Sequence, residues 1–187
     1  AEQICRLVEA THGHTLVLFT SYSLMGAVYN QVKGRMVFPL MEVWRHSQDV
    51  IHRFKQTQNA VLFAAGSCWE GVDFPGDMVS SLIIVRLPFP VPDPLSEAER
   101  EQYPTLQDYI KTVVIPDMQV KLRQGFGRAI RTETDTCVVS ILDHRAAPGE
   151  RYHKAVLETL PPIRITSKIE DVEDFIRAKK GPDYFMP

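Results

Sequence analysis

The stretch from Ala60 to Gly76 reads AVLFAAGSCWEGVDFPG, an apolar run that passes directly into a glycine-rich segment. An uninterrupted apolar run of this length is typical of a strand that is buried on both faces of a parallel sheet. Gly66, Gly71 and Gly76 favour tight turns and let other groups approach the backbone closely. Because ligands gather at the carboxyl ends of parallel strands, the segment is predicted to be a loop at a binding edge. A plain connection between a strand and a helix is the alternative.

Short apolar runs of the same kind recur along the chain and alternate with stretches of helical periodicity. The six predicted strands are Leu16–Thr20, Arg35–Leu40, Ala60–Ala65, Ser81–Leu87, Thr136–Leu142 and Ile163–Thr166. The predicted helices are Gln3–Thr11, Ser21–Lys33, Asp49–Gln56, Pro116–Arg123, Arg151–Leu160 and Ile169–Lys180. This alternation predicts an α/β fold in which helices cover a parallel sheet.

The composition is that of an ordinary globular domain. Of the 187 residues, 44% are hydrophobic and 24% are charged, and the formal net charge is −2. This balance disfavours a protein that coats nucleic acid by charge alone but leaves room for a local basic patch. Cys5, Cys68 and Cys137 are widely separated and lack a metal-binding spacing, which suggests a reducing compartment. Since no apolar run is long enough for a membrane span, we expect a cytoplasmic protein without a membrane partner.

One segment interrupts the alternation of strands and helices. Leu87–Tyr103 reads LPFPVPDPLSEAEREQY and has a proline at every second position from Pro88 to Pro94. Alternating prolines enforce an extended backbone and cannot donate the hydrogen bonds of a sheet. The segment is therefore predicted to be a long crossover loop, or else a functional loop over a binding groove.

The clearest chemical signal is the segment QGFGRAIR, which runs from Gln124 to Arg131 at the end of a helical pattern. In a helical turn Arg128 and Arg131 would lie on one face, and Gln124 would project from the face that carries Arg128. Paired guanidinium groups suit the oxygens of a phosphate chain. Gly127 would let a ligand approach closely beside them. A solvated basic helix is the alternative reading.

Two other segments also carry polar groups to predicted strand ends. Glu70 and Asp73 supply carboxylates that would suit a ribose hydroxyl or a partner arginine. Leu18–Ser23 reads LFTSYS, where hydroxyl and N–H groups at a helix N-terminus could bind phosphate. Tyr22 there could stack on a base. Helix capping by Ser21 is the simpler explanation.

The chain lacks the usual phosphate cradle. It contains no G-x-x-x-x-G-K-[ST] segment and no Asp-Glu dipeptide of an acidic magnesium box. The chain therefore has arginines that can sense a phosphate, but the phosphate-binding loop and the metal ligands of a complete active site would have to come from elsewhere.

Taken together and in this order, the segments resemble motifs IV, V and VI of superfamily 2 helicases, and they are most similar to the DinG/XPD-like branch, especially bacterial DinG-type proteins. FTSYSLM resembles motif IV, GSCWEGVDFPG resembles motif V, and RLPFPVPDP resembles the proline-rich run that follows. RQGFGRAIRTETDTCVVSILDHR resembles motif VI and the next strand. The likeness covers nearly the whole chain and is strongest from Thr15 to Arg145.

The resemblance implies a RecA-like domain of the P-loop-NTPase type, with a mostly parallel sheet and helices on both faces. Residues 1–187 would be one such domain, the C-terminal helicase domain of a longer ATP-dependent DNA helicase. Its partners would be single-stranded DNA and the first RecA-like domain, which would hold the Walker A and B motifs, most Mg²⁺ ligands and any iron–sulfur cluster. Such proteins couple ATP hydrolysis to translocation, usually 5′ to 3′, and unwind duplexes in repair or replication. A bacterial protein of this kind would be cytoplasmic and nucleoid-associated.

The resemblance also implies roles for single residues. Arg128 and Arg131 would be arginine fingers, with Gln124 beside them as a sensor of the γ-phosphate. The residues expected near ATP are Gly71, Asp73, Glu70 and Gly127. Those expected to face DNA are Ser21, Tyr22, Ser67 and Trp69. We expect the isolated chain to be inactive. An RNA helicase domain, or a non-catalytic RecA-like interaction module, are the alternative functions.

Overall fold

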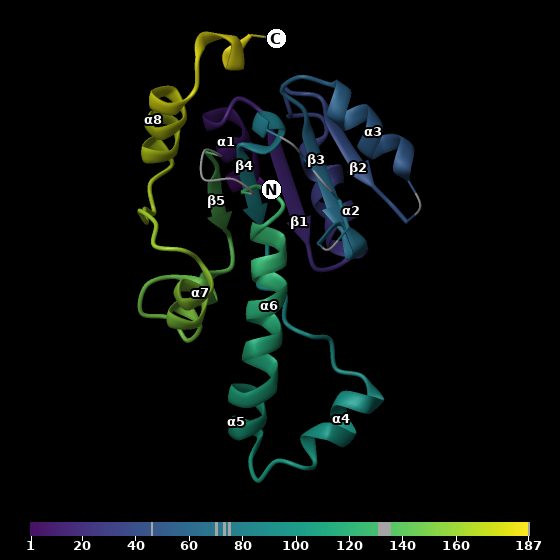
Figure 1. Cartoon of the computed structure of the whole chain (residues 1–187). Coiled ribbons are helices and arrows are strands. Elements are labelled where there is room, and N and C mark those ends of the chain that lie inside the picture. Colours follow the sequence, from purple (N-terminus) through teal and green to yellow (C-terminus); the bar gives the residue numbers. More distant parts are fainter. Residues whose placement is uncertain (46, 70, 73, 75, 131–135, 187) are drawn as a thin grey trace.

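The central feature of the protein is a parallel sheet. The computed structural model describes residues 1–45, 47–69, 71, 72, 74, 76–130 and 136–186. Within them five parallel strands form one sheet in the order β2-β3-β1-β4-β5 (Figure 1). The strands are β1 (Thr15–Phe19), β2 (Leu40–Val43), β3 (Val61–Ala65), β4 (Ser81–Ile84) and β5 (Val138–Ile141). The predicted parallel α/β architecture is confirmed.

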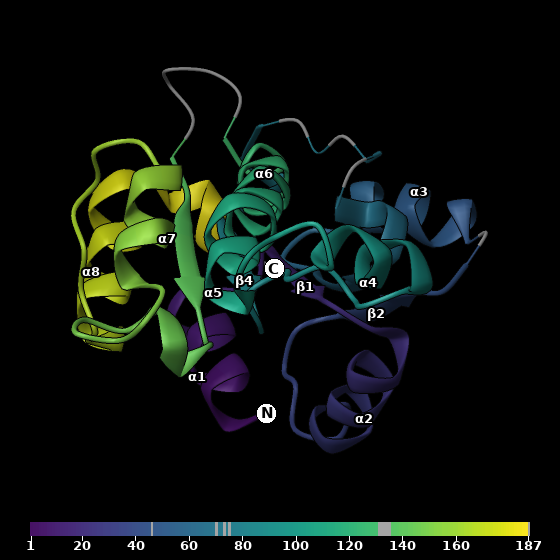
Figure 2. The ribbon, with the colours of Figure 1, turned by 90° about the horizontal axis from the view of Figure 1, so that it is seen from below.

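Helices cover both faces of this sheet. The helices of the described residues are α1 (Glu2–Ala10), α2 (Tyr22–Val32), α3 (Gln48–Gln56), α4 (Pro94–Arg100), α5 (Leu106–Tyr109), α6 (Ile115–Phe126), α7 (His153–Thr159) and α8 (Ile169–Lys179). Of these, α4 and α5 lie away from the sheet (Figure 1). Seen from below, α1 and α2 lie on one side of the sheet and α3 and α6 on the other (Figure 2). None of the described helices is both long enough and apolar enough to cross a membrane.

Strand β1 shows why the sheet needs cover on both sides. All five of its residues are buried. Leu16 and Leu18 belong to the core under α3 and α6, whereas Val17 and Phe19 belong to the core under α1 and α2. Successive side chains of a strand point to opposite faces, so a strand between two helical layers needs an unbroken apolar run.

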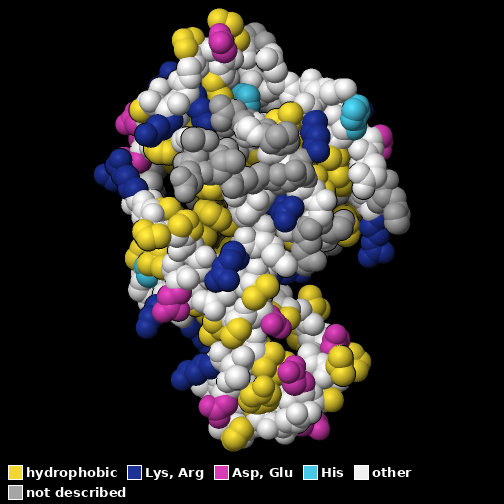
Figure 3. All heavy atoms as spheres, in the orientation of Figure 1, with side chains coloured by type: hydrophobic (Ala, Val, Ile, Leu, Met, Phe, Trp, Pro, Cys, Tyr) yellow, Lys and Arg dark blue, Asp and Glu magenta, His cyan; other side chains and the backbone are white. Residues whose placement is uncertain are grey.

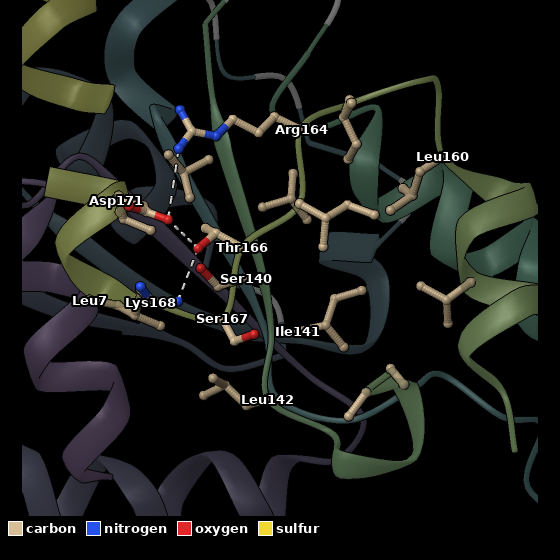
Figure 4. A pocket seen from close by; sticks show the side chains of 18 of the residues that line it. Leu7, Ser140, Ile141, Leu142, Leu160, Arg164, Thr166, Ser167, Lys168 and Asp171 are labelled. Carbon is tan, nitrogen blue, oxygen red and sulfur yellow. Dashed lines mark hydrogen bonds and ion pairs between the residues drawn. The ribbon is translucent and has the colours of Figure 1, made fainter. Parts of the chain in front are cut away.

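Two of the predicted strands are wrong. The strand expected over Arg35–Leu40 begins only at Leu40, because Pro39 has no N–H group to donate to the sheet. The strand expected over Ile163–Thr166 does not form. That segment follows two prolines and lies across a cavity of about 580 Å³ from β5 (Figure 4). It therefore has the composition of a strand, but no described strand lies beside it for pairing.

The proline-rich segment opens an arm that extends away from the sheet (Figure 1). Its first part is extended, as predicted, but residues 94–100 form the helix α4 instead of a loop. Asp93 caps this helix by accepting a hydrogen bond from the Ser96 N–H at 2.8 Å. After α5 the arm returns through a π-helical turn, Ile110–Val114, which leads directly into α6. Hydrophobic and acidic side chains are interspersed on the arm's surface (Figure 3).

The C-terminal turn Pro182–Phe185 packs at the amino edge of the sheet. The Tyr184 hydroxyl donates to the carbonyl oxygen of Thr11 at 2.8 Å, and the Asn59 side-chain amide donates to the carbonyl oxygen of Met186 at 2.7 Å. These bonds fix the last described residues at the edge opposite to the carboxyl ends of the strands.

Candidate functional site

Trp69 joins the three segments that the sequence singles out. It ends the short 3₁₀ helix Gly66–Trp69, which directly follows β3. Its ring N–H donates to the carbonyl oxygen of Phe19 at the end of β1, at 2.9 Å. On the other side it packs against Gly125 of α6, where a β-carbon would lie only 2.8 Å from the indole Cζ3. The loop after β3, the end of β1 and the end of α6 therefore meet at one indole.

This position corrects the DNA-facing role expected for Trp69. Only 1% of its surface is exposed, and its ring N–H is already used by Phe19. The side chain is a core element that supports the site from within and has no face available to a nucleic acid. Cys68 beside it is buried as well, and burial raises the pKa of its thiol.

Arg128 lies just beyond the end of α6. The helix ends at Phe126 with Gly127 as its cap, and the Arg128 N–H continues the turn by donating to the carbonyl oxygen of Gly125 at 3.0 Å. The guanidinium Nη1 donates to the carbonyl oxygen of Val72 at 2.8 Å. Its Nη2 has no hydrogen-bond partner among the described residues. The structure thus brings the arginine segment against the glycine-rich loop, where Nη2, which is unbonded among the described residues, is suited to binding an anion.

Two neighbours of Arg128 are also placed. The Gln124 side chain is exposed, while its carbonyl oxygen accepts a 3.3 Å hydrogen bond from Nε of Arg128. Among the described residues, a β-carbon at Gly127 would meet only ordinary contacts at 3.5 Å, so packing against them does not require a glycine there. Gly71 is exposed next to Val72. Three predicted residues, Glu70, Asp73 and Arg131, lie outside the described residues, as does the side chain of Ser67.

The segment after β1 forms a second group at the carboxyl edge of the sheet. Ser21 caps α2, since its hydroxyl accepts a hydrogen bond from the Leu24 N–H at 3.2 Å, so the capping interpretation is confirmed. Tyr22 is half-buried and lies against Gly66. Gly66 has φ +63°, and a β-carbon there would lie 2.9 Å from the Tyr22 hydroxyl oxygen. Here the glycine is needed for both the turn and the close approach.

Sequence analysis missed two exposed residues of this group, Trp44 and Arg45. They follow β2 directly, at the same edge of the sheet. The indole of Trp44 stacks on Tyr22 with ring centroids 5.6 Å apart and planes 16° apart. The guanidinium carbon of Arg45 lies 5.6 Å from the centre of the Tyr22 ring. A basic residue beside an aromatic one at a strand's end is a recognisable signal. It was missed because the strand was predicted to end at Leu40.

Asp143 fixes the start of the proline-rich arm. One of its carboxylate oxygens accepts the Leu87 N–H at 3.0 Å, and both accept guanidinium N–H groups of Arg145, at 2.9 and 2.7 Å. Burial by itself would raise the pKa of Asp143, but these hydrogen bonds and the charge of Arg145 outweigh it and hold the pKa at about 2. Arg145 also lies over the ring of Phe89, 4.9 Å from its centre. The arm is therefore anchored where β4 and β5 end.

A resident metal centre is not evident in the part of the chain that the structure describes. There, no three His, Cys, Asp or Glu side chains come together in a way that could hold a metal ion. The 580 Å³ cavity beside β5 is largely apolar (Figure 4). Neither Arg128 nor Tyr22 lines it, although Phe126 and Ile130, on either side of Arg128, do. What the described site offers a ligand is guanidinium, amide and backbone N–H groups, which suit phosphate oxygens.

Comparison with known proteins places this geometry in a family. The family model described as "Helicase C-terminal domain" matches residues 4–163. The ATP-dependent DNA helicase YoaA of Escherichia coli is 35% identical over 91% of this chain and 27% of its own length. The ATP-dependent helicase DinG of Mycobacterium tuberculosis is 33% identical over 94% of this chain and 27% of its own length. The chain thus spans less than a third of these relatives.

Two further comparisons are consistent with this assignment. The 3′-5′ exonuclease DinG of Bacillus subtilis is 31% identical over 88% of this chain and 19% of its own length. A solved structure named "XPD apo" superposes with a TM-score of 0.67 at 23% identity, over 84% of this chain and 33% of that one. The XPD likeness shows the fold.

Proposed function

Because the chain belongs to the family of helicase C-terminal domains, of the DinG/XPD-like type, we propose that it is the second motor domain of an ATP-dependent DNA helicase. The observation that carries the proposal is the bond from Arg128 to the carbonyl oxygen of Val72. It holds a guanidinium group against the loop after β3, and Nη2, which has no partner in the part of the chain that the structure describes, would donate to a phosphate. An interaction module without catalysis would have no use for such an arginine.

In this proposal ATP binds between this domain and the first RecA-like domain. Arg128 and Arg131 approach the γ-phosphate and stabilise the charge that develops as it is transferred. The exposed amide of Gln124 lies beside Arg128 and is suited to sensing the same phosphate. Gly71, Asp73, Glu70 and Gly127 complete the nucleotide side. The Mg²⁺ ligands, and any iron–sulfur cluster, belong to the first domain.

Single-stranded DNA follows the carboxyl edge of the sheet. Ser21 and the turn that contains Ser67 present backbone and hydroxyl groups to the phosphates, and Tyr22 supports that edge. Closure of the two domains on ATP, and their opening after hydrolysis, would move the DNA contacts along the strand. We propose movement from 5′ to 3′, duplex unwinding in repair or replication, and a location in the cytoplasm at the nucleoid.

The test is ATP hydrolysis by the full-length protein, with and without single-stranded DNA. We expect DNA to stimulate hydrolysis, and Arg128→Ala to lower the stimulated rate by about 10³–10⁵-fold without loss of thermal stability. Arg177→Ala is the matched control, because Arg177 is an exposed arginine on α8 that pairs with Glu173. A folded Arg128→Ala protein with wild-type turnover would overturn the arginine-finger role. Stimulation by RNA but not by DNA would instead support an RNA helicase.

A further inference from the structure

The carboxyl edge of the sheet carries an exposed indole that the motifs do not account for. Trp44 follows β2, and 44% of its surface is exposed. Burying a large aromatic side chain is favourable, so an indole left this open at a binding edge needs a reason. The other tryptophan of the chain, Trp69, is fully buried.

The indole of Trp44 is also held in place. Tyr22 stacks on it in a nearly parallel arrangement, with ring planes 16° apart. Its outer carbons pack over Gly26 of α2, where a β-carbon would lie 3.5 Å from Cη2. Tyr22 in turn rests on Gly66, the left-handed residue that follows β3. Contacts from α2 and from the loop after β3 therefore fix the indole, and the ring loses little conformational freedom when a ligand stacks on it.

A positive charge lies beside this platform. Arg45 is exposed, and its guanidinium lies against Tyr22 at 5.6 Å from the ring centre. Within the described part of the chain it forms no ion pair with a carboxylate. An aromatic face next to an exposed guanidinium matches one unit of a single nucleic-acid strand, a base together with its phosphate.

We propose that Trp44 is a stacking platform for a base of single-stranded DNA, with Arg45 binding the adjacent phosphate and Tyr22 positioning the indole from behind. This inference rests on the proposed function and deepens it, because it assigns a base contact where the motifs supply backbone contacts. Stacking is tolerant of sequence, since every base has a π face. A motor that moves along any sequence can therefore use such a contact at each step.

The test compares two strands in binding titrations with the full-length protein. One is an oligothymidylate of about 16 nucleotides, and the other is an abasic strand of equal length, which keeps the phosphates and lacks the bases. We expect Trp44→Ala to weaken binding of oligothymidylate about tenfold and to leave the abasic strand unchanged. Trp44→Phe should keep most of the affinity. Arg45→Gln should weaken both strands equally and reduce the salt slope by about one.

Val37→Ala is the control. Val37 is an exposed apolar residue that precedes β2 and lies at the opposite end of this β-strand from Trp44. The variant should bind both oligonucleotides like the wild-type protein. An unchanged affinity of Trp44→Ala for oligothymidylate would overturn the inference and leave the helicase function intact if DNA still stimulates ATP hydrolysis. An equal loss on both strands would also overturn it, since it would indicate that Trp44 packs against another part of the protein. Wild-type protein that binds neither strand would overturn the proposed function as well.

Discussion

The backbone of Gly125 lies directly on the indole of Trp69: a β-carbon at Gly125 would lie 2.8 Å from Cζ3 and 2.9 Å from Cε3. Trp69 is held by its bond to Phe19 and cannot move aside easily. We therefore expect Gly125→Ala to lower the free energy of unfolding by about 1–3 kcal/mol, as overpacked cores do. Denaturant unfolding measures this value.

Gly127→Ala is the matched control for Gly125→Ala. In the part of the chain that the structure describes, a β-carbon at Gly127 would meet the carbonyl oxygens of Arg123 and Gln124 at 3.5 Å and nothing closer. Its stability should change by no more than about 0.5 kcal/mol. A loss of ATP hydrolysis without a loss of stability in this variant would support the place of Gly127 beside the nucleotide. Equal destabilisation by the two variants would contradict the packing argument.

Alanine variants of Gly66 and Gly76 distinguish the cost of backbone strain from the cost of a steric clash. Both are left-handed, with φ +63° and +61°, but among the described residues Gly66 faces a side chain, the hydroxyl of Tyr22, whereas Gly76 faces none. Gly66→Ala should therefore destabilise the protein more than Gly76→Ala, by about 1 kcal/mol or more. In a Tyr22→Phe background most of this excess should disappear, because the phenolic oxygen at 2.9 Å is gone and only the ring carbons at 3.3 and 3.4 Å remain. The same loss in both glycine variants would show that strain alone accounts for it.

Asp143 should make the free energy of unfolding depend on pH in the acid range. Its pKa falls from 3.8 to about 2 on folding, so its charged form stabilises the protein by about 2 kcal/mol at pH above 3.8. That contribution is lost as the pH falls through the folded pKa of about 2. Asp143→Asn should remove this slope between about pH 4 and 2 and weaken the protein at neutral pH. Asp174→Asn, at an exposed position on α8, should keep the slope, and a persistent slope in Asp143→Asn would assign it to other groups.

Arg128→Lys tests whether the proposed role of Arg128 requires the planar guanidinium group and not merely a positive charge. A lysine keeps the charge but cannot donate to Val72 and to a phosphate through two separate fixed N–H groups. We expect DNA-stimulated ATP hydrolysis by the full-length protein to fall nearly as far as in Arg128→Ala. Arg123→Lys, an exposed change in the last turn of α6, should be neutral. A lysine variant that retains more than about a tenth of the rate would show that charge alone suffices.

The sequence predicted the strands that are buried on both faces, because burial leaves a continuous apolar run in β1, β3 and β4. The prediction failed where the formation of a strand depends on a neighbouring strand with which it can pair. Ile163–Thr166 has the composition of a strand but pairs with no strand that the structure describes. Helix α4 was missed although its start carries two local signals, Asp93 as the cap and Pro94 in the first turn.

The motifs located the segments of the site but not the contacts between them. No spacing rule brings Trp69 under Gly125, since these residues are far apart in sequence and meet only because α6 crosses the sheet above β1. The same holds for Trp44, whose place beside Tyr22 depends on β2 lying next to β3 in the sheet order. Local sequence patterns predict the type of each segment, whereas its contacts with other segments depend on tertiary packing.

The opposite burial of the two tryptophans gives this chain two distinct optical reporters. Trp69 is enclosed by the core, so its fluorescence should be blue-shifted in the native state and move to the red only when the sheet and α6 come apart. Trp44 is open to solvent and should respond to quenchers while the fold stays intact. Two variants that each keep one indole of this chain would therefore report separately on unfolding and on events at the carboxyl edge.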